Sequence, residues 1–521
     1  MDTQQGQRGP TRREVFRAGT AIAASSLLPP PALAAADATI RAGITGYDVV
    51  NTLDPAYAAL IPEYYLIWAV YNALLKFNAD MQPVPDLAES FKVAENGGLE
   101  FKLRQGVKFH DGSTMTSDDV KFSFERLLDD KAPSPNKSKV SAISAIDTPD
   151  PLTVRLQTKE PFAPLLTFLA NARTGTQVVP RKVVQADPTG FGRKPCGTGA
   201  YMLKTWNPNQ ALRFAAHTEY FVPGLPTIGT VDVPLIAEET SGVTALLGHQ
   251  VDLTSTAPFA DVPELAKRQD IKVLRQAGLN TRFISLNNRK PPFDDVHFRR
   301  AVSLAFDRNV LIRVVLFGEG VATSGLIPPS LKASYDPTPK PLTTYNPQRA
   351  KEELAKSKYQ AGTAATMLTW GAGWWKRIAE VIAAQVNQTL GTQFTVEVNE
   401  ANTVFSRLKS GDYQCSVWGW LGMIDPDEYS YDILHSQGWR NFAYYSNPKL
   451  DELLVAARRE LDAAKRGQMY RESEALWIQD MLILPCFCSN VHNLLARNVS
   501  GFTQLPYSNF GDQFATLTLS G

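Results

Sequence analysis

The 521-residue chain is poor in the features that mark several protein classes. It has four cysteines and six histidines, and its 53 basic and 52 acidic residues leave a net charge of +1. Four cysteines are too few for a disulfide-built scaffold, and the near-neutral charge gives no electrostatic footprint for nucleic acid or an anionic membrane. No apolar run reaches the ~20 residues that span a bilayer. We therefore expect a soluble protein with no nucleic-acid partner.

The few cysteines do not indicate a metal centre. Cys486 and Cys488 would share one face of a strand, with His492 nearby, but a metal site needs more ligands than these. The better interpretation is that Cys196, Cys415, Cys486 and Cys488 are buried structural thiols. The sequence predicts no metal and no other cofactor.

The length of the chain argues for at least two lobes, because hydrophobic cores stop growing near ~250–300 residues. Strands and proline-rich connections dominate residues 140–285, whereas helix–strand alternation in residues 290–490 indicates an α/β lobe. Local motifs predict the starts of three helices: a Ser/Thr-x-x-acid start at Thr116-Ser117-Asp118-Asp119, and capping asparagines before proline at Asn346-Pro347 and Asn447-Pro448. An earlier helix is predicted from the helical spacing of Tyr64, Trp68, Tyr71 and Leu75.

The first 36 residues are typical of an export signal. Arg12-Arg13 precede a weakly apolar stretch from Ala18 to Leu28, and Ala32-Leu33-Ala34 supplies an Ala-x-Ala cleavage site. The paired arginines resemble a twin-arginine signal, with an ordinary Sec signal or a basic disordered tail as the alternatives. No cysteine follows the apolar stretch, which argues against a lipoprotein anchor. We expect a periplasmic protein.

One long run carries a family resemblance. The segment from Phe101 to Leu128, FKLRQGVKFHDGSTMTSDDVKFSFERLL, resembles the bacterial extracellular solute-binding family 5, the periplasmic oligopeptide, dipeptide and nickel binding proteins. Further family motifs follow the expected order along the chain: Leu53-Asp54-Pro55, Pro85 to Ser90, Gly197 to Tyr201, Phe298 to Asp307-Arg308, Tyr345 to Ala350, Gly419-Trp420, Asp425 to Asp427, Tyr445 to Pro448 and Asp451 to Leu454. Their order makes the resemblance specific, since no single motif would be.

The resemblance implies an α/β fold like the type II periplasmic binding proteins, with two lobes joined by crossing hinge strands and an extra subdomain in the first lobe. Domain I would comprise residues 37–282 and 491–521, and domain II residues 283–490. The crossings are expected near Phe283 to Asn287 and near Leu484 to Asn490. The implied function is the substrate-binding component of an ABC transporter, a monomer without enzymatic activity. It would deliver a small molecule or peptide to membrane permease subunits with a cytoplasmic ATPase.

Tryptophans near acidic residues are the first candidates for ligand contact. Trp418 and Trp420 flank Gly419, so on a strand both rings would face one side. Beside Asp425 and Asp427, two indoles suit a cationic or amphipathic ligand. The alternative for each tryptophan is packing in the core of domain II.

Two further segments offer candidates. Trp370, Trp374 and Trp375 lie around two glycines before a helix, and clustered aromatic residues on loops suit ligand contact. Arg440, after Trp439, presents a guanidinium fork that suits a carboxylate, with an ordinary surface loop as the alternative.

The ligand itself is left open. In dipeptide-type members an aspartate shortly after Gly-Trp receives the peptide amine, but here the nearest positions are Met423 and Ile424. A peptide or peptide-like ligand is favoured, with a metal chelate, an opine or a sugar derivative as alternatives. Less favoured are a chemosensing binding protein and a secreted hydrolase, for which the chain has no Gly-x-Ser-x-Gly or His-Glu-x-x-His motif.

Overall fold

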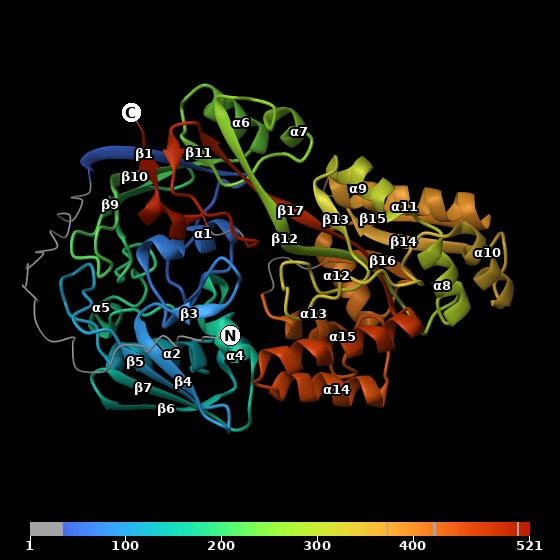
Figure 1. The fold of residues 1–521 in the computed structure, drawn as a ribbon, viewed down its shortest axis with the longest axis horizontal. Coiled ribbons are helices and arrows are strands. Elements are labelled where there is room, and N and C mark those ends of the chain that lie inside the picture. The colour runs from blue at the N-terminus through green and yellow to red at the C-terminus, as the bar shows by residue number, and fades with distance from the viewer. Residues whose placement is uncertain (1–34, 372, 420–423, 508–509, 521) are drawn as a thin grey trace, which may run out of the picture.

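The computed structural model describes residues 35–371, 373–419, 424–507 and 510–520. Residues 1–34 of the expected signal segment therefore lie outside the described residues, and so does Trp420. Figure 1 shows two lobes, the first blue to green with red C-terminal segments and the second yellow to orange. Two long strands, β12 (Ile271–Leu286) and β17 (Ile483–Ala496), run between them (Figure 1).

A single large sheet extends through both lobes. In the described residues it has eleven strands, in the order β15-β14-β16-β12-β17-β11-β1-β10-β9-β8, with β13 on β17. The strands not yet bounded are β1 (Ala35–Thr45), β8 (Tyr201–Asn207), β9 (Ala211–Ala216), β10 (Ile228–Ile236), β11 (Leu253–Thr254), β13 (Gly320–Ala322), β14 (Ala364–Trp370), β15 (Gln393–Asn399) and β16 (Cys415–Gly419). β1 pairs in parallel with β10 and β11, and β14 in parallel with β15 and β16.

The crossing strands are paired with each other along most of their length. Antiparallel pairing runs from Ile271 opposite Ala496 to Ser285 opposite Ile483, with register shifts between Ala277 and Asn280 and between Arg282 and Phe283. Such bulges bend a strand and increase its local twist. The connection between the lobes is therefore a hydrogen-bonded ribbon with two irregular points, and both predicted crossing segments overlap it.

The first lobe contains an added subdomain. Its sheet has the order β4 (Ala88–Val93), β5 (Leu99–Leu103), β7 (Thr153–Thr158), β6 (Ile143–Asp150). The short pairs are β2 (Leu75–Phe77) with β3 (Pro83–Pro85), and β18 (Val499–Ser500) with β19 (Thr518–Leu519). The helices of this lobe are α1 (Ile61–Val70), α2 (Ser117–Leu128), α3 (Lys137–Val140), α4 (Pro164–Leu169), η1 (Ala172–Thr174), α5 (Arg181–Ala186), α6 (Glu239–Leu247), α7 (Val262–Leu265) and η2 (Gly511–Thr516).

The second lobe alternates helices with strands, as expected of residues 290–490. Its helices are α8 (Val296–Leu304), α9 (Arg308–Leu316), α10 (Pro347–Lys356), α11 (Trp374–Leu390), α12 (Ala401–Ser410), α13 (Pro426–Leu434), α14 (Pro448–Arg459) and α15 (Ala463–Asp480). Figure 1 places α4 of the first lobe beside α14 and α15, so the lobes also approach each other away from the crossing strands.

The predicted helix starts are confirmed. Thr116 and Asp119 form a capping box at α2, and Asn346 and Asn447 cap α10 and α14. The expected helix through Tyr71 and Leu75 is wrong in its second half, because α1 ends at Val70. Beyond Val70 the backbone hydrogen bonds are made with a distant segment instead of within the helix. The Val70 carbonyl accepts a hydrogen bond from the Gly199 N–H at 2.9 Å. All four cysteines are free and buried, as predicted.

Candidate functional site

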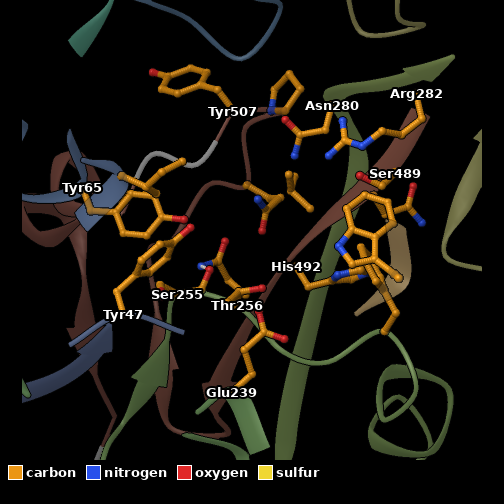
Figure 2. A pocket seen from close by; sticks show the side chains of 18 of the residues that line it. Tyr47, Tyr65, Glu239, Ser255, Thr256, Asn280, Arg282, Ser489, His492 and Tyr507 are labelled. Carbon is orange, nitrogen blue, oxygen red and sulfur yellow. Dashed lines mark hydrogen bonds between the residues drawn. The ribbon is translucent and has the colours of Figure 1, made fainter. Parts of the chain in front are cut away.

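A cavity of about 230 Å³ lies beside the crossing strands, between the two lobes. The crossing strands contribute Asn280, Arg282 and the run from Ser489 to Asn493, and the second lobe contributes Trp374. The rest of the lining comes from the first lobe and the C-terminal segment: Tyr47, Ile61, Tyr65, Arg173, Glu239, Ser255, Thr256, Phe259, Gln504, Pro506 and Tyr507. Figure 2 shows polar groups around an open centre, with aromatic rings along its walls.

One end of the cavity carries a carboxylate. Glu239 is the first residue of α6, and burial raises the pKa of its carboxyl, which a hydrogen bond with the Thr256 side chain partly offsets. Gly46 packs beside it with φ +79°, and a Cβ there would lie 3.4 Å from the Glu239 Cγ. Glycine at this turn therefore supplies the left-handed backbone and leaves room for the acidic side chain.

The other end carries a buried cation. Arg282, on β12, is 2% exposed and donates a hydrogen bond to the Thr281 carbonyl at 2.9 Å. Its guanidinium carbon lies 4.7 Å and 4.6 Å from the ring centroids of Trp374 and Trp375. Burial lowers the pKa of Arg282 to about 9, so the group remains protonated at neutral pH. The two indole faces stabilise that charge in place of water.

Four of the predicted tryptophans form one aromatic cluster. Trp370 lies 4.2 Å from Trp375 and 5.2 Å from Trp418, and Trp374 lies 5.1 Å from Trp375, between ring centroids. Trp375 and Trp418 are buried, and Trp374 alone of the four reaches the cavity lining. The cluster thus supports a single cavity-lining ring and its contact with Arg282.

The structure places the two predicted aspartates in ion pairs away from this cavity. Asp425 caps α13 and accepts two hydrogen bonds from the Arg466 guanidinium at 2.5 and 3.0 Å, and Asp427 pairs with Arg458 at 2.7 Å. Asp425 and Arg466 form part of the wall of a second interlobe cavity of about 240 Å³, whose lining is otherwise largely apolar. The carboxylates hold α13 against α14 and α15.

Arg440 also lies apart from the cavity at the crossing strands. It follows α13 in a turn, where its backbone N–H donates to the Asp432 carbonyl at 3.0 Å. Its guanidinium carbon lies 3.7 Å from the ring centroid of Trp439, a side chain that is 54% exposed.

Sequence reasoning missed most of the lining residues. A signal existed for Asn280 and Arg282, because polar residues precede the apolar run that predicts the first crossing. Nothing local distinguishes Glu239 from an ordinary acidic first turn of a helix. His492, in the same lining, has its Nε2 3.0 Å from a Glu319 carboxylate oxygen. In the described residues, no group of three or more potential metal ligands is found.

The geometry defines a two-lobed solute-binding protein with its cavity at the joint between lobes. Residues 82–441 match the model of the bacterial extracellular solute-binding proteins, family 5, middle region. The chain belongs to this family, and it is a substrate-binding component of the ABC-importer type. Within the described part of the chain, no helix combines the length and the apolar character that crossing a membrane requires.

Relatives are similar over nearly the whole chain. The glutathione-binding protein GsiB of Escherichia coli strain K12 is 26% identical over 532 residues, covering 97% of this chain and 99% of its own. The structure of HbpA2 from Haemophilus parasuis has a TM-score of 0.84 at 24% identity, over 92% of this chain and all of its own. AgaA of A. tumefaciens R10, in complex with agropinic acid, has a TM-score of 0.76 at 25% identity, over 93% and 99%.

Proposed function

We propose that the protein is exported to the periplasm, through a signal of the twin-arginine type, and there captures a small peptide-like solute between its lobes. The observation that carries this proposal is the cavity at the crossing strands, which has residues of both lobes and charges of both signs in its lining. Pockets of this kind are mainly closed by apolar and aromatic groups and orient a ligand through a few polar ones. The name of the relative GsiB, a glutathione-binding protein, supports a peptide-like ligand.

The protein acts by closure and delivery, without turnover of its ligand. Residues 37–282 with 491–521, and residues 283–490, behave as two bodies whose closed arrangement is favoured by a ligand that touches both. Away from the joint the lobes already meet, because the Thr167 hydroxyl donates to Asp425 at 2.8 Å and the Ala163 N–H to the Arg458 carbonyl at 2.9 Å. Ligand entry requires these contacts to open, and the closed monomer then docks on the permease.

Among the predicted site residues, Trp374 makes the direct ligand contact in this proposal. Trp370, Trp375 and Trp418 position its ring, and Asp425, Asp427 and Arg440 are left with structural roles. Trp420, outside the described residues, stays a candidate contact.

Calorimetry and scattering test the proposal together. Purified protein lacking residues 1–36 is titrated with glutathione and with unblocked tripeptides, and native mass spectrometry identifies any solute retained through purification. We expect binding of one molecule per chain and a smaller radius of gyration by small-angle scattering when the site is filled. Saturable binding with an unchanged envelope would contradict closure, and no binding together with no retained solute would refute the proposed ligand class.

An opine is the second candidate ligand. AgaA, which shares the fold over 93% of this chain, was solved with agropinic acid. Adding agropinic acid to the same titrations decides between the candidates, because a preference for it over every tripeptide of tenfold or more would favour the opine.

A further inference from the structure

The cavity at the crossing strands is polarised along its length. Figure 2 shows Glu239 and Arg282 on opposite sides of the open centre, with His492 between them and with Ser255 and Thr256 close to Glu239. The cationic end is already stabilised, since the Arg282 guanidinium lies over two indole rings. The acidic end is built differently.

Among the described residues, the charged groups that act on the pKa of Glu239 are carboxylates, although Arg173, a second cation, lines the same cavity. The electrostatic effects on its pKa come from Asp261 and Glu238, both of which disfavour a further negative charge. The ion pairs found among the described residues do not include Glu239. Its hydrogen bond with the Thr256 side chain satisfies only part of a carboxylate's accepting capacity. Burying a carboxylate costs free energy unless it is paired and hydrogen-bonded, so this end of the cavity is suited to a cation brought by the ligand.

We propose that Glu239 binds a cationic amine of the ligand while Arg282 binds a carboxylate, so the transported compound is a zwitterion with its amine held by the first lobe. This inference rests on the proposed function. The aromatic residues of the lining, Tyr47, Tyr65 and Phe259 among them, then contact the uncharged part of the ligand.

The experiment compares probes that differ only at the amine. Wild type, Glu239→Gln and Glu238→Gln are titrated with glutathione and triglycine and with the N-acetylated form of each. Glu238 is the matched control, because it is the adjacent carboxylate, is exposed and does not line the cavity. We expect N-acetylation to weaken binding to wild type at least tenfold. Glu239→Gln should weaken the free-amine probes by a similar factor and leave the acetylated ones within twofold. Glu238→Gln should stay within twofold throughout.

The outcomes separate this inference from the proposed function. If Glu239→Gln keeps wild-type affinity for a free-amine probe, or weakens free and acetylated probes equally, the amine anchor is refuted while the binding function stands. A solute retained by wild type is released and treated with an amine-reactive label, and a compound without an amine refutes the anchor in the same way. If no probe binds and no solute is retained, both proposals fail. Circular dichroism of each variant excludes loss of fold as the cause.

Discussion

Replacing Asp425 with asparagine removes one charge from a buried ion pair. Asp425 is fully buried, and its partner Arg466 is 9% exposed. Asparagine retains one oxygen that can cap α13 in place of Asp425 Oδ1, but its NH2 group cannot accept from Thr167 as Oδ2 does. The substitution therefore removes the charge and one interlobe hydrogen bond and preserves the helix cap. What remains is the Arg466 guanidinium, buried without its main counter-charge.

The expected loss of stability is large. Removing one partner of a buried ion pair costs about 3–5 kcal/mol, because the remaining charge stays desolvated. For a folding unit the size of one lobe, each kcal/mol of lost stability lowers the melting temperature by about 2–4 °C. The melting temperature should therefore fall by roughly 6–20 °C. Thermal and urea unfolding followed by circular dichroism measure the change. The matched control is Glu160→Gln, which removes a carboxylate from the exposed interlobe pair with Arg459 and should cost less than about 1 kcal/mol.

The same variant separates a structural role from a role in binding. Asp425 does not line the cavity at the crossing strands, so its replacement should affect ligand affinity only through the lost interlobe hydrogen bond with Thr167. One such bond contributes about 1 kcal/mol, so the affinity of the folded Asp425→Asn protein should change by no more than about fivefold. A variant with unchanged stability and strongly reduced affinity would refute this reasoning. It would also restore the interpretation of Asp425 as a ligand contact.

Two further predictions concern binding and pH. Trp374→Ala should weaken ligand binding by about 2 kcal/mol, some 30-fold, while Trp439→Ala, at a 54% exposed ring outside the cavity, should leave calorimetric affinity unchanged; equal effects would remove Trp374 from the site. Burial raises the pKa of Glu474 from 4.5 to about 7. The folded state therefore binds this proton more tightly, and the stability that Glu474 contributes is complete below about pH 4.5 and lost as pH rises through 7. We expect the stability of Glu474→Gln relative to wild type, measured by urea unfolding, to rise by roughly 2–3 kcal/mol between pH 4.5 and pH 8. If the stabilities of the two proteins change in parallel with pH, this prediction is contradicted.

The parts of the fold that sequence predicts are those set by local chemistry. Thr116 with Asp119, and asparagine before proline at Asn346 and Asn447, begin helices because the capping hydrogen bonds form within one turn. The end of α1 at Val70 is decided by the Gly199 N–H, which is supplied by a segment about 130 residues away. Helical spacing through Tyr71 and Leu75 could not reveal that competition.

The candidate site shows the same division. Clustered tryptophans are visible in sequence, and four of them do form one connected cluster, through Trp370 and Trp375. Whether Asp425 faces a ligand or an arginine depends on Arg466, which is 41 residues further along the chain. Glu239 and Trp374 meet one cavity only because the sheet brings their segments to the same joint. Contacts of this range have no periodic signature.

The irregular points of the ribbon coincide with the cavity wall. One register shift ends at Asn280 and the other begins at Arg282, and both residues line the cavity. A solute seated there would press on the flexing points directly, with no relay of intervening side chains. A substitution at Asn280 or Arg282 that changes the affinity for the solute should therefore also change the rate at which the lobes move relative to each other.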